Sequence, residues 1–356
     1  MSKNKNKNKA PAPKAPTPPK STVPATPTMG EAAMAGSIET STGEHKVINF
    51  YQKRWVFFTI SLIFIACGIA AALINGIKLD ISFQGGSIIE YTYDATNTTI
   101  DLTEAGKLAT EALGQSASCQ DQSSYATGDH FLVINVAGTD SISQDQQQAV
   151  TSALEKAYPN AKLTFYTSQS VEPFTGKRFF HEGLLAILIS FGLILVYVGI
   201  RFQKIGGFSA GAMAIVALLH DAFIVTSVFF LFQIPLNDMF VAAVLTIIGF
   251  SINDTIVIYD RIRENKTLMG PKTPTEVLVD ASITQCMSRS INTNISVFVS
   301  ITIVFIFAQV YNIETIKDFA LPMMFGTISG CYSTICIAGP LWTSYKNHQA
   351  KKTLNA

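Results

Sequence analysis

The sequence predicts a polytopic α-helical membrane protein with six transmembrane helices and one small external α+β domain between the first two of them. The first observation is composition: 48% of the 356 residues are hydrophobic and 14% are charged, against about 25% charged in an ordinary soluble domain. The second is that six apolar runs are long enough to cross a bilayer core of about 30 Å. The third is that Lys and Arg gather in the short loops on one side.

The chain begins with a hydrophilic tail, residues 1–45, in which Lys alternates with Asn and then Pro with Ala, Thr and Lys. This composition cannot bury enough apolar surface to offset its ordering entropy, so we expect a disordered tail. Residues 46–75 form a juxtamembrane segment and the first transmembrane helix, whose apolar run spans 55–74. Lys53 and Arg54 directly precede that run, which places the amino end in the cytoplasm.

Residues 76–178 form the long hydrophilic region after the first helix, and we expect them to fold outside the membrane. Three stretches are strand-like, and two others show helical periodicity with a capping Ser, Thr or Asp at their start. In chain order these are strand 87–93, helix 103–113, strand 131–136, helix 143–157 and strand 162–167. We therefore expect a small α+β domain. Gly85 and Gly86 are interpreted as a tight backbone turn and not a phosphate-binding loop, because no helix starts there.

Residues 179–345 contain the other five apolar runs, and residues 346–356 form a short basic tail. The runs span 183–200, 208–231, 239–259, 292–310 and 319–345. On the side of the amino end, the loops and tail hold Arg201, Lys204, Arg261, Arg263, Lys266, Lys272, Arg289, Lys346, Lys351 and Lys352. The short loops on the opposite side hold only Lys317. This asymmetry predicts both termini in the cytoplasm.

Two acids, Asp221 and Asp254, lie within apolar runs, where an unpaired charge costs several kcal/mol. Asp221 continues a stripe of small residues, so we expect it to face a neighbouring helix. Asn253 ends a similar stripe, and Asp254 lies about 100° further round that helix. We expect four helices to pack with their polar stripes inward. These stripes are Ala210, Ala214, Ala217 and Asp221; Ala242, Thr246, Gly249 and Asn253; Arg289, Thr293, Ser296 and Ser300; and Gly326, Ser329, Gly330 and Ser333.

Two interpretations of this polar interior stay open. In the first, Asp221 and Asp254 form a proton relay, taking up a proton from one side of the membrane and releasing it to the other. In the second, both are static groups hydrogen-bonded to Asn, Thr or Ser. His220, about 100° from Asp221, is either a relay member or an interhelical hydrogen-bond partner. Arg261 is either a relay member or a cytoplasmic anchor.

Several motifs resemble the SecF subunits of the bacterial Sec protein-export machinery, within the SecD/SecF family, over residues 49–341. The most specific is IGFSINDT at 248–255, which runs into DRIREN at 260–265. The others are Phe83 with Gly85 and Gly86, Leu219-His220-Asp221, and Arg289-Ser290. Ser82 departs from the family pattern, which usually has an acid there, and Glu172 stands where Gly is common.

The resemblance implies helices of the resistance-nodulation-division type, a ferredoxin-like external domain and a location in the bacterial cell membrane. It implies pairing with SecD, association with the SecYEG channel, and contact with the exported polypeptide and membrane lipids. SecA and subunits of the YidC or YajC type are further candidate partners, and no nucleic acid is expected. The implied process is late export driven by the proton gradient, without enzymatic chemistry, and Asp221 and Asp254 match acids of the family's proton path.

The five cysteines show no CxxC or Cys/His spacing, so we expect no disulfide framework, metal site or cofactor. Two rival functions stay open. One is half of a resistance-nodulation-division exporter of drugs, lipids or metals, which would be expected to carry a larger external domain. The other is a scaffold or insertase partner without ion coupling, which would not need two membrane acids.

Overall fold

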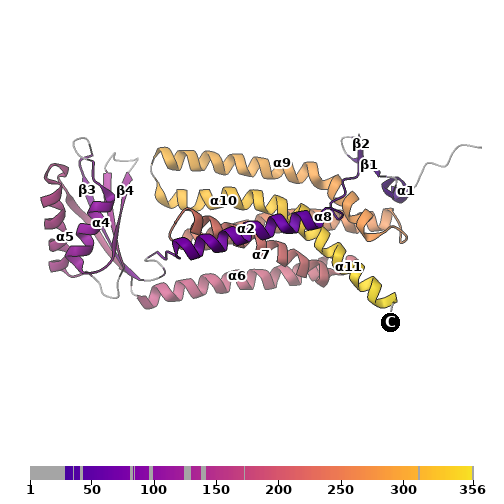
Figure 1. Ribbon diagram of the computed structural model, residues 1–356, viewed down its shortest axis with the longest axis horizontal. Coiled ribbons are helices and arrows are strands. Elements are labelled where there is room, and N and C mark those ends of the chain that lie inside the picture. The colour runs from indigo at the N-terminus through magenta and orange to yellow at the C-terminus, as the bar shows by residue number, and fades with distance from the viewer. Residues whose placement is uncertain are drawn as a thin grey trace, which may run out of the picture.

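The computed structural model consists of a long helical bundle with a small sheet domain at one end (Figure 1). It describes residues 29–34, 36–40, 43–80, 83, 85–95, 99–123, 130–137, 142–171, 173–311 and 313–354. Six helices in this part of the chain are long and apolar enough to cross a membrane. They are α2 (Arg54–Asn75), α6 (Pro173–Arg201), α7 (Gly207–Leu231), α8 (Asp238–Leu268), α9 (Thr275–Val310) and a sixth made of α10 (Glu314–Ser333), a π-helical segment (Thr334–Ala338) and α11 (Gly339–Leu354). The predicted fold class is confirmed.

Helix α9 begins well before the predicted residue 292 and is 36 residues long. Its first half contains polar residues that the sequence analysis assigned to a loop. That half also carries Leu278, Val279, Ala281 and Ile283, which belong to one buried apolar cluster. The predicted start at residue 292 was wrong. The first half of α9 packs against other parts of the chain and does not need the continuous apolar run of a membrane-spanning segment.

The amino-terminal segment lies against the start of α9, at the end of the bundle opposite the sheet domain (Figure 1). It forms α1 (Met29–Met34) and a two-stranded hairpin of β1 (Ser37–Thr40) and β2 (Gly43–Lys46). Val47 and Phe50 are buried in the same cluster as Val279, and the Tyr51 amide donates a 3.1 Å hydrogen bond to Asp280 Oδ1. The predicted disorder is therefore wrong for the described part of residues 29–45, and residues 1–28 lie outside the described residues.

The external domain has a four-stranded antiparallel sheet in the order β4-β5-β3-β6. Its elements are β3 (Gly86–Tyr93), α4 (Leu102–Leu113), β4 (Ala117–Ser123), β5 (His130–Ala137), α5 (Gln144–Ala157) and β6 (Thr164–Val171). This βαββαβ order is the ferredoxin-like arrangement that the resemblance implied. The sequence analysis missed β4 because its residues, ASCQDQS, show no apolar alternation. A strand at the sheet edge is stabilised by hydrogen bonds to one neighbour only.

The glycine motif lies where the external domain meets the bundle. Phe83 is buried, and its ring centroid is 5.4 Å from that of Phe180 on α6. Gly85 and Gly86 have φ angles of 80° and 151°, which L side chains rarely adopt, so the backbone conformation here favours glycine. The motif therefore connects the Phe83–Phe180 contact, at the end of the bundle next to the sheet domain, to strand β3.

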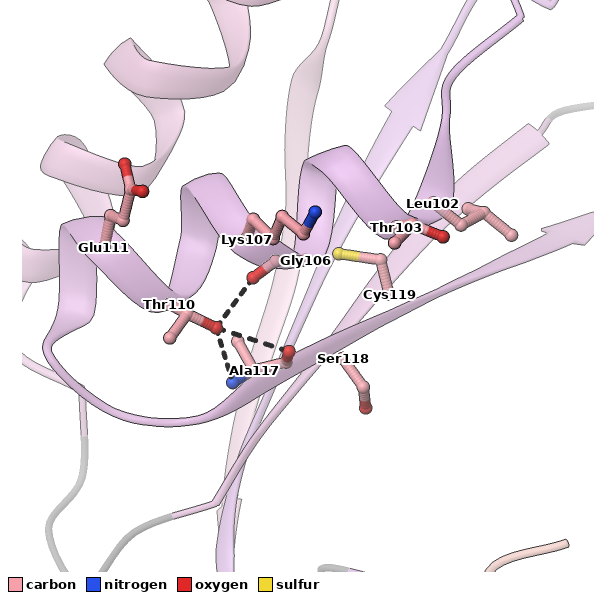
Figure 2. Close-up of a pocket in the computed structure, with 9 residues that line it drawn as sticks. All are labelled: Leu102, Thr103, Gly106, Lys107, Thr110, Glu111, Ala117, Ser118 and Cys119. Carbon is pink, nitrogen blue, oxygen red and sulfur yellow. Dashed lines mark hydrogen bonds between the residues drawn. The ribbon is translucent and has the colours of Figure 1, made fainter. Parts of the chain in front are cut away.

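A pocket of about 450 Å³ is lined by residues of α4 and the edge strand β4, and the Cys119 side chain points toward α4 there (Figure 2). Thr110 Oγ1 accepts a 3.0 Å hydrogen bond from the Ala117 amide and donates to the Gly106 carbonyl, which fixes the strand against the helix. Burial raises the pKa of the Cys119 thiol to about 12. The thiol therefore stays protonated at neutral pH.

We expect Cys119 to react slowly with iodoacetamide at pH 8 while the domain is folded, because the thiolate is the reactive form. Unfolding the domain should accelerate labelling by at least about tenfold, measured by mass spectrometry of the Cys119 peptide. A cysteine at the exposed neighbouring position, in a Ser118→Cys/Cys119→Ser protein, is the matched control and should label rapidly in the native state. Equal native rates at the two positions would contradict the prediction.

Candidate proton-relay site

Asp221 is fully buried at the centre of the helical bundle and is surrounded by hydroxyl donors. Ser251 on α8 and Ser333 on α10 each donate a 2.6 Å hydrogen bond to Asp221 Oδ2. Ser329 on α10 donates a 2.6 Å bond to Oδ1, and His220 Nδ1 lies 3.2 Å from the same oxygen. Hydrogen bonds to a carboxylate favour its charged form and offset part of its desolvation cost. The site therefore links a carboxylate on α7 to two other helices, α8 and α10, through neutral hydroxyl groups.

Small residues bring these helices together. Ala210, Ala214 and Ala217 on α7 are buried, so the stripe that carries Asp221 faces the bundle as predicted. On α10, a Cβ at Gly330 would lie 3.3 Å from Ser251 Cβ, and one at Gly326 only 2.6 Å from Ile247 Cγ1. Larger side chains would hold α10 away from α8. The glycines thus allow the serines of α10 to reach Asp221.

His220 contacts Asp221 directly, although the sequence analysis placed the two side chains about 100° apart. Its Nδ1 also lies 3.5 Å from Ser329 Oγ, and its ring centroid is 6.1 Å from that of Tyr332. The other ring nitrogen, Nε2, is buried and has no hydrogen-bond partner among the described residues. His220 is therefore part of the Asp221 site, with one polar atom left to bind a further group such as an internal water.

Asp254 lies three residues after Ser251 and is buried, with 6% of its surface exposed. The side-chain amide of Asn294, on α9, donates a hydrogen bond to Asp254 Oδ2. Arg289, also on α9, is the basic residue whose charge acts on this carboxylate. The second acid thus has an amide donor and a neighbouring cation, whereas Asp221 has only hydroxyls and an imidazole.

Arg261, the basic relay candidate from the sequence, contacts neither acid. Its Nε donates a 2.6 Å hydrogen bond to Gln285 Oε1, and its guanidinium forms a 2.7 Å ion pair with Glu264. The contact with Gln285 joins the end of α8 to α9, whereas the ion pair with Glu264 lies within α8. They match the anchor interpretation better than the relay interpretation.

Asn253 points away from the bundle, contrary to the expectation that its stripe packs inward. Asn253 and Gly249 are exposed, and the buried face of α8 instead carries Ile247, Ser251 and Asp254. The polar stripe of α9 behaves in the same way, since its members Arg289, Thr293, Ser296 and Ser300 are all exposed. The inward packing was predicted correctly for α7 and α10 and wrongly for α8 and α9.

Sequence reasoning did not connect Ser251, Ser329 and Ser333 with Asp221, and it missed Asn294. The serines were recognised as polar residues within apolar runs, but their common target depends on how three helices cross. A weak signal existed in their spacing, because Ser329 and Ser333 are four residues apart and so lie on one helix face. Beyond Ser251, polar contacts continue through Thr255, whose Oγ1 lies 3.2 Å from Thr334 Oγ1. Among the described residues, no cluster of His, Cys, Asp and Glu could hold a metal ion.

Comparison with known proteins supplies relatives over most of the chain. Residues 149–348 match the family model described as protein export membrane protein SecD/SecF, C-terminal. The protein translocase subunit SecF of Alicyclobacillus acidocaldarius is 33% identical over 302 residues, covering 84% of this chain and 93% of that protein. The protein translocase subunit SecDF of Bacillus subtilis is 32% identical over 85% of this chain and 39% of its own length. The crystal structure of SecDF from Thermus thermophilus superposes with a TM-score of 0.68 and 26% identity over 84% of this chain and 39% of that one.

Proposed function

The chain belongs to the SecD/SecF family of protein-export membrane proteins, and we propose that it is an accessory subunit of the Sec translocase that uses the proton gradient. It pairs with SecD, associates with the SecYEG channel and promotes the late translocation of exported polypeptides. The external domain lies outside the cytoplasm, and both termini lie inside it, as the distribution of Lys and Arg favours. Its relatives from Alicyclobacillus acidocaldarius and Bacillus subtilis are likewise named protein translocase subunits.

The contacts of Asp221 support the proposed coupling between proton uptake and helix movement. A charged Asp221 accepts hydrogen bonds from Ser251, Ser329 and Ser333, which come from two other helices. A proton on Oδ2, the oxygen that accepts from Ser251 and Ser333, needs an acceptor of its own, so one of these two serines must turn or withdraw. Because these serines lie on α8 and α10, taking up one proton changes the contacts between α7, α8 and α10. A proton movement is thereby linked to helix movement.

Asp254 is the second member of the proposed relay. It lies on the same buried face of α8 as Ser251, so α8 joins the two acids. Arg289 is a basic residue close enough to interact with Asp254, and the Asn294 amide can donate a hydrogen bond to Asp254 in either protonation state. We propose that Arg289 takes the role of the basic residue in the relay, in place of Arg261.

The outward polar faces of α8 and α9 support pairing with SecD. An exposed Arg, Asn or Ser at membrane depth costs free energy against lipid, whereas a neighbouring helix with polar groups satisfies it. Gly249 and Asn253 on α8 and Arg289, Thr293 and Ser296 on α9 together form such a face. In the SecDF relatives, the segment that matches this chain makes up about two fifths of a single longer chain. We therefore assign this face to SecD.

Copurification tests the assignment. A tagged chain isolated in mild detergent should bring SecD and SecYEG with it, identified by mass spectrometry. A Gly249→Leu variant should lose SecD, because the new side chain projects from the pairing face while nothing in the chain itself lies within 4 Å of the added Cβ. Gly192→Leu, at an equally open position of α6, is the matched control and should retain SecD. Recovery of the wild-type chain without SecD or SecYEG would contradict the proposal and favour an exporter or scaffold.

Neutralising the two arginines should separate their roles. Arg289→Gln should reduce stimulation of export to the level of membranes that lack the chain, because the charged state of Asp254 loses its neighbouring cation. Arg261→Gln should retain most of the activity, since the side-chain partners of Arg261 among the described residues are Gln285 and Glu264 and neither relay acid. Export of a model precursor into inverted membrane vesicles at a fixed proton gradient measures both. The reverse order of effects would restore Arg261 as the relay residue.

A further inference from the structure

Three lysines from separate elements meet at the turn between α6 and α7. Lys204 lies in that turn, Lys266 in the last turn of α8, and Lys346 on α11. Lys266 Nζ donates a 2.8 Å hydrogen bond to the Lys204 carbonyl. Lys346 Nζ lies 2.6 Å from the position that a Cβ on Gly206 would occupy. We call these three residues the lysine cluster.

The lysine cluster is not neutralised by the acids around it. Arg201 and Arg263 both pair with Asp260, and Arg261 pairs with Glu264. Within the described ranges, no carboxylate forms an ion pair with Lys204, Lys266 or Lys346. The charge of Lys266 acts unfavourably on that of Lys346. The ammonium groups of Lys266 and Lys346 thus lie at the backbone of the turn that carries Lys204, while the nearby acids pair with arginines.

A cavity of about 470 Å³ lies beside the lysine cluster, lined by Lys204, Arg263, Glu264, Thr267 and Leu268. Leu268 lines the cavity and is 54% exposed, and Ile200 and Phe208, at the ends of α6 and α7 on either side of the Lys204 turn, are 64% and 66% exposed. The site lies where the apolar parts of α6 and α7 end, which is the level of lipid headgroups in a bilayer. A ligand with a phosphate next to hydrocarbon matches both the charges and the apolar rim.

We propose that the lysine cluster and this cavity bind the phosphate headgroup of an anionic phospholipid such as phosphatidylglycerol. The ammonium groups contact the phosphate, and the acyl chains lie along Ile200, Phe208 and Leu268. Basic residues on this side of a membrane protein are common for topological reasons alone. That rule does not require the ammonium groups of Lys266 and Lys346 to lie against the turn that carries Lys204, beside a cavity that Lys204 and Arg263 line, while arginines pair with the carboxylates. Bound lipid would connect α6, α7, α8 and α11 at the membrane surface.

Native mass spectrometry of the purified full chain tests the proposal. Equimolar phosphatidylglycerol and phosphatidylcholine are added in neutral detergent, and the ratio of the two bound lipids is measured. The wild-type chain should prefer phosphatidylglycerol, and Lys204→Gln/Lys266→Gln/Lys346→Gln should bind both equally. Lys272→Gln/Lys351→Gln/Lys352→Gln loses the same charge on the same side and should keep the preference. Single Lys346→Gln should lower the ratio about fivefold, the factor equivalent to about 1 kcal/mol per basic residue.

Three outcomes would overturn the proposal. The first is equal lipid ratios in the two triple variants, which would mean that net charge and not the cluster selects the lipid. The second is loss of the phosphatidylglycerol preference when inorganic phosphate is added, which would assign the site to a free anion. The third is an unchanged ratio in Lys346→Gln, whose single substitution keeps the test available if the triple variant fails to fold. None of these readouts depends on export activity, so they are independent of the proposed function.

Discussion

Asp221→Asn is expected to leave the chain in the membrane and paired with SecD but to abolish its stimulation of export. Asparagine keeps the volume of the side chain, and its oxygen still accepts a hydrogen bond from Ser329. Its amide group can donate to Ser251 and Ser333 after their hydroxyls rotate, so the packing persists. What is lost is the titratable proton on which coupling depends. Export into inverted vesicles at a fixed proton gradient measures the loss.

The matched control for this prediction is Asp238→Asn, an exposed acid in the first turn of α8. It removes the same charge from the chain and should leave export unchanged. Asp254→Asn belongs to the same experiment and should resemble Asp221→Asn, because both acids are placed in the relay. Full export activity in Asp221→Asn and Asp254→Asn would rule out the relay and leave both acids as static hydrogen-bonding groups.

Gly207→Ala is expected to cause the largest loss of stability among single small substitutions in the bundle. A Cβ on Gly207 would lie 2.1 Å from the Gly199 carbonyl oxygen and 3.0 Å from Gly199 Cα. These are backbone atoms of α6, so no side chain can move aside, and the two helices must separate. Overpacking of this kind costs about 1–3 kcal/mol or more. The purified chain should show a lower denaturation midpoint in detergent.

Gly192→Ala is the control for this substitution, because no atom lies within 4 Å of the added Cβ on α6. Its effect should be neutral or slightly stabilising, since Ala favours helix by about 1 kcal/mol over Gly in a helix interior. Equal midpoints for the two variants would show that α6 and α7 do not approach each other as closely as the structure has them.

Sequence patterns predicted the six helices and the inward face of α7, because a membrane-spanning helix needs a long continuous run of apolar residues that can be recognised in the sequence alone. The apolar runs indicate the spans, and the alanines before Asp221 indicate a helix contact. Asn253 is an exception, because it was predicted to face inward and is exposed. Its stripe of small and polar residues was recognised, but periodicity identifies a face without saying whether the chain's own helices or another protein covers it.

Other features depend on contacts between distant residues. Ser329 and Ser333 are 108 and 112 residues from Asp221 in sequence, and only the crossing of α7 and α10 brings them to one carboxylate. Strand β4 has a polar sequence and is defined by its pairing with β5. The first half of α9 resembles a loop in composition and is helical because it packs against the amino-terminal segment. The only local signal among these interactions is the four-residue spacing of Ser329 and Ser333, which identifies a shared helix face but not its partner.

The length of α9 has a mechanical consequence. Its 36 residues form a rod of about 54 Å, well beyond a hydrocarbon core of about 30 Å. Asn294, which contacts Asp254, lies near the middle of this rod, and the amino-terminal hairpin rests against one end. A tilt of about 10° about the far end would displace the hairpin end by about 9 Å. α9 can therefore act as a lever. A small rotation of the helix at the Asp254–Asn294 contact becomes a larger displacement of the amino-terminal hairpin at the end of the helix.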